Sequence, residues 1–201
     1  MLLALDTSSD YVSLALFKDN TLIAHAHQPM TTGQAESLFP MLNTLLKQAK
    51  ATATDISHIA VAVGPGSFTG VRIGLATARA FALALNTTVI GITNFDIAAY
   101  NIKTAVKVVL NTKRGDFFVQ DFDAKGHAIS APTIKTADQL KQELPFTAVG
   151  SGAPLLTNAI NCITTSSDLP EAISLGYIAL TQPEKHQPAV PVYLREADVT
   201  I

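Results

Sequence analysis

The sequence predicts an α/β protein in which one order of strands and helices occurs twice, and three observations predict it. First, apolar runs of strand length alternate with stretches that have helical periodicity. Second, the apolar run Ile59–Val63 leads through a glycine-rich loop into Val71–Leu85, an Ala/Leu-rich stretch without proline that predicts a helix. Third, similar five-residue stretches, Ala62–Gly66 and Ala148–Gly152, occupy the same place in the two halves.

The first half is expected to contain eight elements. The strand and the helix that flank the glycine-rich loop are the fifth and sixth of them. Short apolar or alternating runs between turn residues predict the strands. Leucines and a methionine at the spacing of one helical stripe predict the first helix. The expected elements are strands Leu2–Leu5, Tyr11–Phe17 and Thr21–His27, helix Leu38–Ala49, strand Ile59–Val63, helix Val71–Leu85, strand Thr87–Ile92 and a helix from Thr93 to Tyr100.

The second half repeats this order, β-β-β-α-β-α-β-α, with a mixed sheet expected in each half. A boundary near Asn101–Lys103 separates the two expected domains, 1–102 and 103–201. The expected elements are strands Val106–Leu110, Asp116–Phe122 and His127–Ala131, helix Thr136–Leu144, strand Thr147–Val149, helix Leu155–Ile160, strand Cys162–Thr164 and a helix after Pro170.

The composition indicates a well-packed globular protein. The chain has 201 residues, of which 48% are hydrophobic and 15% charged, with a formal net charge of −2. Without a basic stripe, strong nucleic-acid binding by this chain alone is not expected. The single cysteine, Cys162, fits a reducing compartment. No signal peptide and no apolar run of about 18 residues is recognised, so a cytoplasmic protein without a membrane span is expected.

The glycine loop permits two interpretations. Gly64, Gly66 and Gly70 separate a strand from a helix start, with Ser67 and Thr69 where helix caps belong. Such a loop binds an anion at the helix N-terminus or allows the strand and helix to pack tightly. The standard phosphate-loop motif is absent, because Val71-Arg72 follows Gly70 where Lys-Ser/Thr is required. The glycines also miss the Rossmann spacing.

Three stretches carry a family resemblance: Ala4–Ser8 (Ala-Leu-Asp-Thr-Ser), Gly64–Gly74 (Gly-Pro-Gly-Ser-Phe-Thr-Gly-Val-Arg-Ile-Gly) and Pro191–Arg195 (Pro-Val-Tyr-Leu-Arg). The duplicated order and the first strand ending in Asp-Thr-Ser resemble the ribonuclease H-like, actin-like ATPase (ASKHA) fold. The stretches themselves resemble the TsaB (YeaZ) family. That resemblance implies a non-catalytic scaffold subunit that dimerises with the transferase TsaD. The complex forms threonylcarbamoyladenosine beside the anticodon of tRNA.

The resemblance also implies a degenerate nucleotide site and a set of partners. No cofactor and no metal is expected, because Asn111 replaces the acid that an active ATPase places in its second phosphate loop. Expected partners are a TsaD-like subunit, a TsaE-like ATPase through the complex, and a second copy of the chain when it is alone; tRNA is contacted only through the complex. The residues implied for the nucleotide site are Asp6, Thr7, Ser8, Asn111, Gly150 and Gly152.

The Val71–Leu85 helix is apolar nearly all round, so more than one side of it should be covered. Small residues form two ridges, Gly74–Ala78–Ala82 and Ala76–Ala80–Ala84, which allow close helix approach. The Leu38–Ala49 helix or a partner subunit covers the second side. The resemblance favours the partner, with the expected interface Glu36, Leu38, Leu42, Arg72, Leu75, Ala76, Arg79 and Ala80.

Other interpretations remain open at this point. An active ATP-dependent kinase or ATPase of the same fold is the main alternative function, although Asn111 disfavours it. Asp6 is either the residual acid of a nucleotide site or a strand-end aspartate that bonds the Thr7–Ser9 turn. His25 and His27 share one strand face but lack a third ligand, and a metallopeptidase is disfavoured by the lack of a His-x-x-x-His pair.

Overall fold

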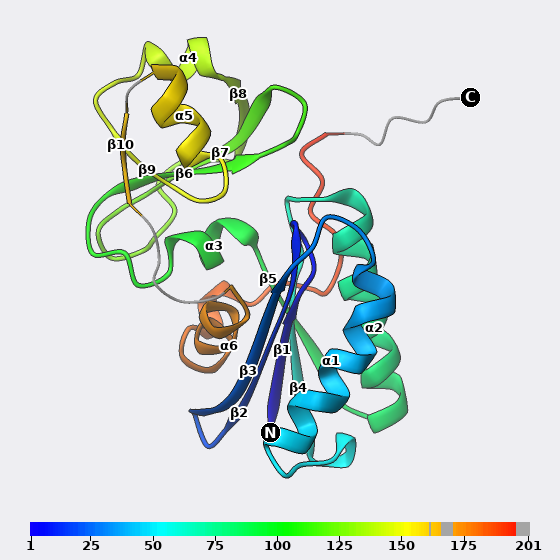
Figure 1. The fold of residues 1–201 in the computed structure, drawn as a ribbon. Helices are drawn as coiled ribbons and strands as arrows, with labels where there is room; N and C mark the ends of the chain where they lie inside the picture. Colours follow the sequence, from blue (N-terminus) through cyan, green and yellow to red (C-terminus); the bar gives the residue numbers. More distant parts are fainter. Residues whose placement is uncertain (161, 166–170, 196–201) are drawn as a thin grey trace. The chain divides into compact units, whose positions relative to one another are not determined.

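The computed structural model contains two compact units, each built on a five-stranded mixed sheet, and it describes residues 1–160, 162–165 and 171–195 (Figure 1). The first unit comprises residues 1–97 and 169–192, and the second comprises 98–168 and 193–201. The predicted α/β class with two mixed sheets is confirmed. The first unit is not one continuous segment, as a division after residue 102 would make it, because residues 169–192 also belong to it.

The first sheet has the order β3-β2-β1-β4-β5. Strand β1 pairs antiparallel with β2 and parallel with β4, so the sheet changes from antiparallel to parallel at β1. In this register Asp6, the last residue of β1, lies opposite Ser13 of β2. The strands are β1 (Leu2–Asp6), β2 (Tyr11–Lys18), β3 (Thr21–Pro29), β4 (His58–Ala62) and β5 (Thr88–Ile92).

Helices cover both faces of this sheet. Helices α1 and α2 lie on one face, whereas α6 lies on the other (Figure 1). Most of α6 is buried against β1 and β2, which explains why the C-terminal part of the chain returns to the first unit. The helices are α1 (Gln34–Gln48), α2 (Phe68–Leu85), α3 (Asn94–Ala99) and α6 (Glu171–Thr181), with 3₁₀ turns at Ala53–Asp55 and Pro183–Lys185.

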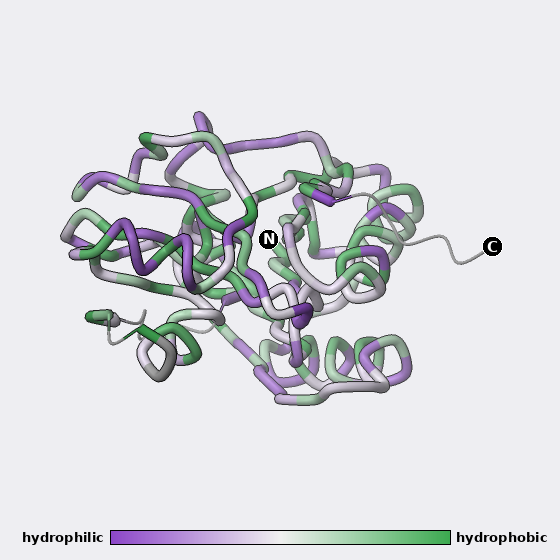
Figure 2. Tube along the Cα trace, turned by 90° about the horizontal axis from the view of Figure 1, so that it is seen from above, coloured by the Kyte–Doolittle hydropathy of each residue, from purple (hydrophilic) through white to green (hydrophobic). Residues whose placement is uncertain are grey.

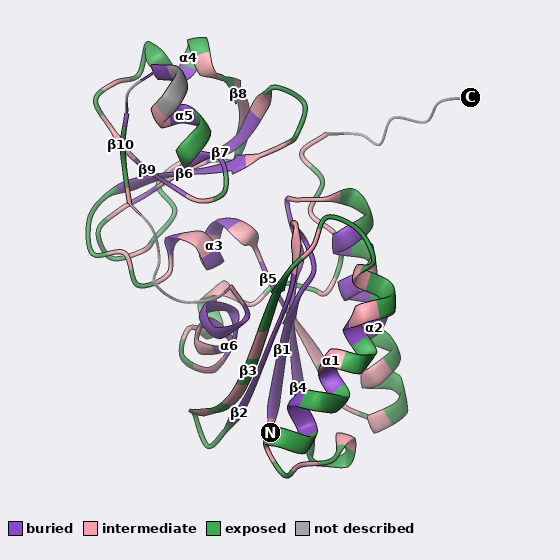
Figure 3. Ribbon diagram, viewed as in Figure 1, coloured by how far each residue is buried: buried purple, intermediate pink, exposed green. Residues whose placement is uncertain are grey.

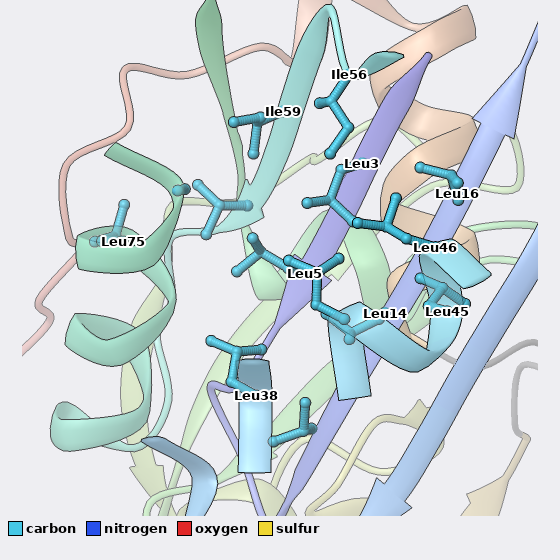
Figure 4. Close-up of a cluster of buried hydrophobic side chains, with 14 of the residues drawn as sticks. Leu3, Leu5, Leu14, Leu16, Leu38, Leu45, Leu46, Ile56, Ile59 and Leu75 are labelled. Atoms are coloured by element: carbon cyan, nitrogen blue, oxygen red, sulfur yellow. The ribbon is translucent and has the colours of Figure 1, made fainter. Parts of the chain in front are cut away.

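The core of the first unit lies between the sheet and α1 and α2. The amphipathic stripe of α1 buries its leucines against Leu3 and Leu5 of β1 and Leu14 of β2 (Figure 4). Figure 2 shows hydrophobic and hydrophilic residues alternating along the helical turns of the trace, as expected for amphipathic helices. The buried leucines of α1 are Leu38, Leu42, Leu45 and Leu46.

The second sheet has the order β10-β9-β6-β7-β8. Its core gathers Val109 of β6, Phe117 and Val119 of β7 and Leu156 of α5, among others. Cys162 is buried in the same cluster, as a free thiol. The elements are β6 (Val106–Asn111), β7 (Asp116–Phe122), β8 (Thr133–Thr136), α4 (Ala137–Lys141), β9 (Thr147–Val149), α5 (Ala153–Ile160) and β10 (Ile163–Thr164).

The third strand of this sheet is displaced from its predicted position. The strand expected at His127–Ala131 forms only an isolated bridge between Phe122 and Ala128, and β8 begins at Thr133. The reason lies in the Asp123 carboxylate, which accepts hydrogen bonds from the backbone N–H groups of Lys125 and His127 at 2.9 and 2.8 Å. These contacts hold the segment in a turn.

Helix α2 is the long apolar helix of the first unit. Among the described residues it is the one helix that is long and apolar enough, by length and composition, to cross a membrane. Of the residues in this helix, 33% are buried within the structure. Its contacts with β4, β1 and β5 account for its apolar character as part of the first core.

Candidate functional site

The glycine loop between β4 and α2 packs directly against the turn that follows β1. A Cβ atom on Gly66 would lie 2.4 Å from the carbonyl oxygen of Ser8, and one on Gly70 would lie 2.0 Å from that of Thr7. Hydrogen bonds join the same segments: the Ser67 N–H donates to the Ser8 carbonyl at 2.7 Å, and the Thr7 hydroxyl donates to the Gly70 carbonyl at 2.7 Å. The backbone approach therefore requires glycine at both positions.

The start of α2 is capped within the loop. The Ser67 hydroxyl accepts a hydrogen bond from the Gly70 N–H at 3.3 Å, as an N-cap side chain does. Thr69 is exposed, and the Arg72 guanidinium lies 3.7 Å from the centre of the Phe68 ring. Of the two interpretations of the loop, these contacts favour tight strand-to-helix packing.

Asp6 uses both of its carboxylate oxygens within the chain. Oδ1 accepts a hydrogen bond from the Ser8 N–H at 2.7 Å, and Oδ2 accepts one from the Tyr11 hydroxyl at 2.9 Å. Burial raises the pKa of the Asp6 carboxyl above its usual value, although the Ser8 bonds act to lower it. This geometry supports the interpretation of Asp6 as a strand-end residue that holds the following turn.

Asn94 is a central residue of this site that sequence reasoning missed. Its amide Nδ2 donates to the Ser8 hydroxyl at 2.6 Å and to the Pro65 carbonyl at 3.0 Å. Its backbone N–H donates to the Gly64 carbonyl at 2.8 Å. The only local signal is an asparagine at a helix start, so its link to Ser8 becomes visible only in the folded structure.

The expected second phosphate loop lies in the second unit, whereas Asp6, Thr7 and Ser8 belong to the first. The Asn111 side-chain oxygen accepts a hydrogen bond from the Lys113 N–H at 2.8 Å, and the Asn111 N–H donates to the Ser151 hydroxyl at 3.1 Å. Gly152 donates its N–H to the Val109 carbonyl at 2.9 Å, and Gly150 has a positive φ of 105°. Asn111, Gly150 and Gly152 thus form one loop cluster beside β6.

Three predicted interface residues are core residues. Leu38, Leu42 and Leu75 are only 1%, 2% and 2% exposed, because the stripe of α1 and one side of α2 face their own sheet. Figure 4 shows Leu38 and Leu75 within the buried cluster of the first unit. They are therefore removed from the surface that a partner could contact.

The other predicted interface residues are exposed on the outer face of α1 and α2 (Figure 3). The structure also separates the two small-residue ridges of α2. Gly74 and Ala78 are buried against the sheet, whereas Ala76 and Ala80 are exposed. The exposed predicted residues are Glu36, Arg72, Ala76, Arg79 and Ala80.

Large apolar side chains accompany these small residues. Phe39 of α1 is 49% exposed and stacks on Phe81 of α2, with ring centroids 5.8 Å apart. Leu83, near the end of α2, is 87% exposed. We call the surface formed by Phe39, Ala76, Ala80 and Leu83 the outer helix face. It combines apolar anchors with small residues, a composition suited to close packing of a partner helix.

The C-terminal segment is fixed to the first unit beside this face. The Arg79 guanidinium donates to the Ala189 carbonyl through Nε at 3.1 Å and Nη2 at 2.5 Å. Further along, the Val192 N–H donates to the Val63 carbonyl at 2.8 Å, where β4 ends. Arg79 is thus engaged within the chain. In the second unit, Arg195 forms an ion pair with Asp116.

A metal centre is not indicated by the part of the chain that the structure describes, in which no three His, Cys, Asp or Glu side chains come together to hold an ion. His25 and His27 lie on the same face of β3, but His27 pairs with Glu171 at 3.3 Å.

Comparisons with known proteins point to one family. A family model described as TsaD, tRNA N6-adenosine threonylcarbamoyltransferase, matches residues 22–171. An uncharacterized protein of Mycobacterium tuberculosis is 26% identical over 198 residues, covering 98% of this chain and 92% of that protein. The tRNA threonylcarbamoyladenosine biosynthesis protein TsaB of Escherichia coli is 30% identical over 133 residues, covering 64% of this chain and 57% of that protein.

A solved structure shows the same fold. YeaZ from Pseudomonas aeruginosa superposes with a TM-score of 0.78 at 22% identity, covering 96% of this chain and 99% of that one. The match extends over both units, so the duplicated architecture is shared along nearly the whole chain.

Proposed function

The chain belongs to the TsaD family of tRNA N6-adenosine threonylcarbamoyltransferases, in which its named relatives are TsaB proteins, and we propose that it is an accessory subunit in threonylcarbamoyladenosine formation. In this role it acts in the cytoplasm as a scaffold and leaves the transfer reaction to a TsaD-like subunit. The match of the family model to residues 22–171 and the TsaB relatives support this assignment.

The contacts of the candidate nucleotide residues support a non-catalytic role. Both oxygens of Asp6 accept hydrogen bonds from the chain itself, and Asn111 offers an amide that is bonded to its own turn. A phosphoryl-transfer site needs carboxylates that are available to hold Mg²⁺. Neither residue has the chemistry and the freedom that this requires.

The outer helix face is the surface that we assign to the TsaD-like partner, and its exposed apolar side chains are the observation that carries the proposal. Leu83 and Phe39 are 87% and 49% exposed on the described structure, and the exposed alanines of α2, Ala76 and Ala80, permit a close helix approach. Full burial of an exposed side chain such as Leu83 favours association by about 1.5–3 kcal/mol, and the half-buried Phe39 contributes less. Without the partner, the same face pairs two copies of this chain.

The net charge of −2 supports a further part of the proposal, that another subunit makes the tRNA contacts. Binding to phosphates depends on clustered Lys and Arg side chains, which release counterions from the nucleic acid. We therefore assign the tRNA-binding surface to the TsaD-like subunit and expect a TsaE-like ATPase to join through the assembled complex.

Mixing the purified chain with a TsaD-like subunit tests this proposal. Size-exclusion chromatography with light scattering should show a one-to-one complex, and calorimetry should give a dissociation constant of about 1 µM or lower, corresponding to at least ~8 kcal/mol. The chain alone should elute as a homodimer that the partner converts into the heterodimer. Absence of any complex at tens of micromolar of both proteins would refute the partner assignment.

A further inference from the structure

A cavity of about 490 Å³ lies at one end of the second sheet, within the second unit. Its lining comes from the first residues of β6, the last residues of β7, the segment before β9 and the edge strand β10 (Figure 1). Strands β6, β9 and β10 run parallel and β7 runs antiparallel to β6, so these residues meet at the same end of the sheet. Small-molecule sites have volumes of about 300–1,000 Å³.

The walls of this cavity are mostly apolar. Ile129 and Ile163 line it and are 64% and 69% exposed. Phe146 lines it as well and packs against the core of the second unit, which holds the ring in place. Large apolar side chains that stay exposed around a concave surface are typical of ligand sites, because a bound ligand removes them from water.

A buried lysine and an aspartate form the polar end of the cavity. Lys107 is only 6% exposed, and its ammonium pairs with Asp121 Oδ1 at 2.5 Å and with Glu143 Oε2 at 3.1 Å. An ammonium has three N–H donors, so these contacts leave one for a ligand. Asp121 Oδ2 accepts no hydrogen bond from the described residues. The cavity therefore offers one donor and one acceptor side by side.

The two charges at this end disfavour ligand ions of either sign. Burial acts to lower the pKa of Lys107, but its contacts with Asp121 and Glu143 outweigh burial and raise the pKa above the usual value, so Lys107 stays charged. A ligand carboxylate would be repelled by Asp121, and a ligand ammonium would be repelled by Lys107. A neutral group with one acceptor and one donor can bind to both side chains without repulsion.

We propose that this cavity binds a small neutral ring that carries an amide. The amide carbonyl accepts a hydrogen bond from the Lys107 ammonium, the amide N–H donates to Asp121 Oδ2, and the ring packs against Phe146 and the two isoleucines. The Lys107 Nζ atom lies 5.4 Å from the centre of the Phe146 ring, so the aromatic wall adjoins the polar end. The site belongs to the second unit, whereas the outer helix face belongs to the first.

Three ligands that share one ring test the assignment, because benzamide is neutral, benzoate is anionic and benzylamine is cationic at neutral pH. In an NMR titration of the full chain, benzamide should shift the signals of the cavity residues with a dissociation constant of about 1–10 mM, as expected for a ligand of this size. Benzoate and benzylamine should bind at least about 10-fold more weakly. Absence of shifts at tens of millimolar benzamide, or equal binding of all three ligands, would overturn the proposal.

A tryptophan that fills the cavity tests the location. Ala105 is exposed and lines the cavity, so Ala105→Trp should occupy the space without removing a core contact and should abolish benzamide binding. Ala131→Trp is the matched control, since Ala131 is an exposed alanine of the same unit that is not part of the cavity lining. This control should bind like wild type. If both variants bind benzamide equally well, the ligand occupies another surface and the proposal is wrong.

Asp121→Asn tests the electrostatic selection. The ion-pair network of Lys107, Lys135, Asp121 and Glu143 has no net charge, and this substitution leaves it with one positive charge. The affinity for benzoate should therefore rise at least about 10-fold relative to that for benzamide, while benzylamine weakens further. A purely structural role of Asp121 would not change the order of the three ligands. A folded Asp121→Asn variant with the ligand preference of wild type would contradict the proposal.

Discussion

Ala80→Asp is expected to leave the chain folded and to lower its affinity for a TsaD-like subunit by about 100-fold or more. Ala80 is exposed on α2, so an aspartate there is solvated in the isolated chain. In the complex the same carboxylate would be buried against the partner without a compensating cation, at a cost of several kcal/mol. A cost of about 3 kcal/mol corresponds to a factor of about 150 in the dissociation constant.

Two comparison variants make this result specific. Ala80→Ser adds a small uncharged group at the same position and should bind the partner with nearly the affinity of wild type. Ala78→Asp lies on the buried ridge, at 0% exposure, and should unfold the chain rather than affect binding alone. Circular dichroism separates the two effects before calorimetry is attempted. An Ala80→Asp chain that is folded and binds like wild type would place the interface elsewhere.

Gly70→Ala is expected to cause a large loss of stability, because its Cβ would lie 2.0 Å from the Thr7 carbonyl oxygen. That atom belongs to the backbone of a buried turn, so it cannot rotate away as a flexible side chain would. We expect a decrease of about 3 kcal/mol or more in the free energy of unfolding, in line with the upper range for overpacking. For a chain of this size that corresponds to a fall of about 6–12 °C in Tm.

Differential scanning calorimetry of Gly70→Ala beside Thr69→Ala gives the comparison. Thr69 is the adjacent residue and is exposed, so its substitution should change Tm by no more than about 2 °C. If Gly70→Ala has the same Tm as the wild-type protein, the loop tolerates a side chain at this position. The close approach to Thr7 would then not explain the glycine.

Local features of the sequence were sufficient to predict most of the fold. The helical stripe of α1, the strand before Gly64 and the apolar run of α2 are properties of neighbouring residues, and the structure confirms these elements. The order of elements in both halves also follows from such local patterns. The repeated stretch near Gly64 and Gly150 correctly marks two loops that each end a parallel strand.

The remaining features depend on contacts between distant parts of the chain. The α1 stripe predicts an apolar helix face, but such a face can pack against the chain's own sheet or against a partner. Leu38 and Leu42 were assigned to the partner surface, whereas they are buried in the core. Helix α6 is apolar on most sides, yet no local pattern indicates that it packs on the first sheet. The Asn94–Ser8 hydrogen bond joins residues 86 positions apart.

The most direct test of the proposed role is threonylcarbamoyladenosine formation on tRNA by a reconstituted system containing a TsaD-like subunit and the enzymes that supply its substrate. The modified nucleoside is quantified by mass spectrometry with no added chain, with the wild-type chain, or with Ala80→Asp. An accessory subunit predicts that the wild-type chain raises product formation at least about 10-fold, that Ala80→Asp does not, and that the chain alone gives no product. Equal product formation with and without the wild-type chain would contradict the account.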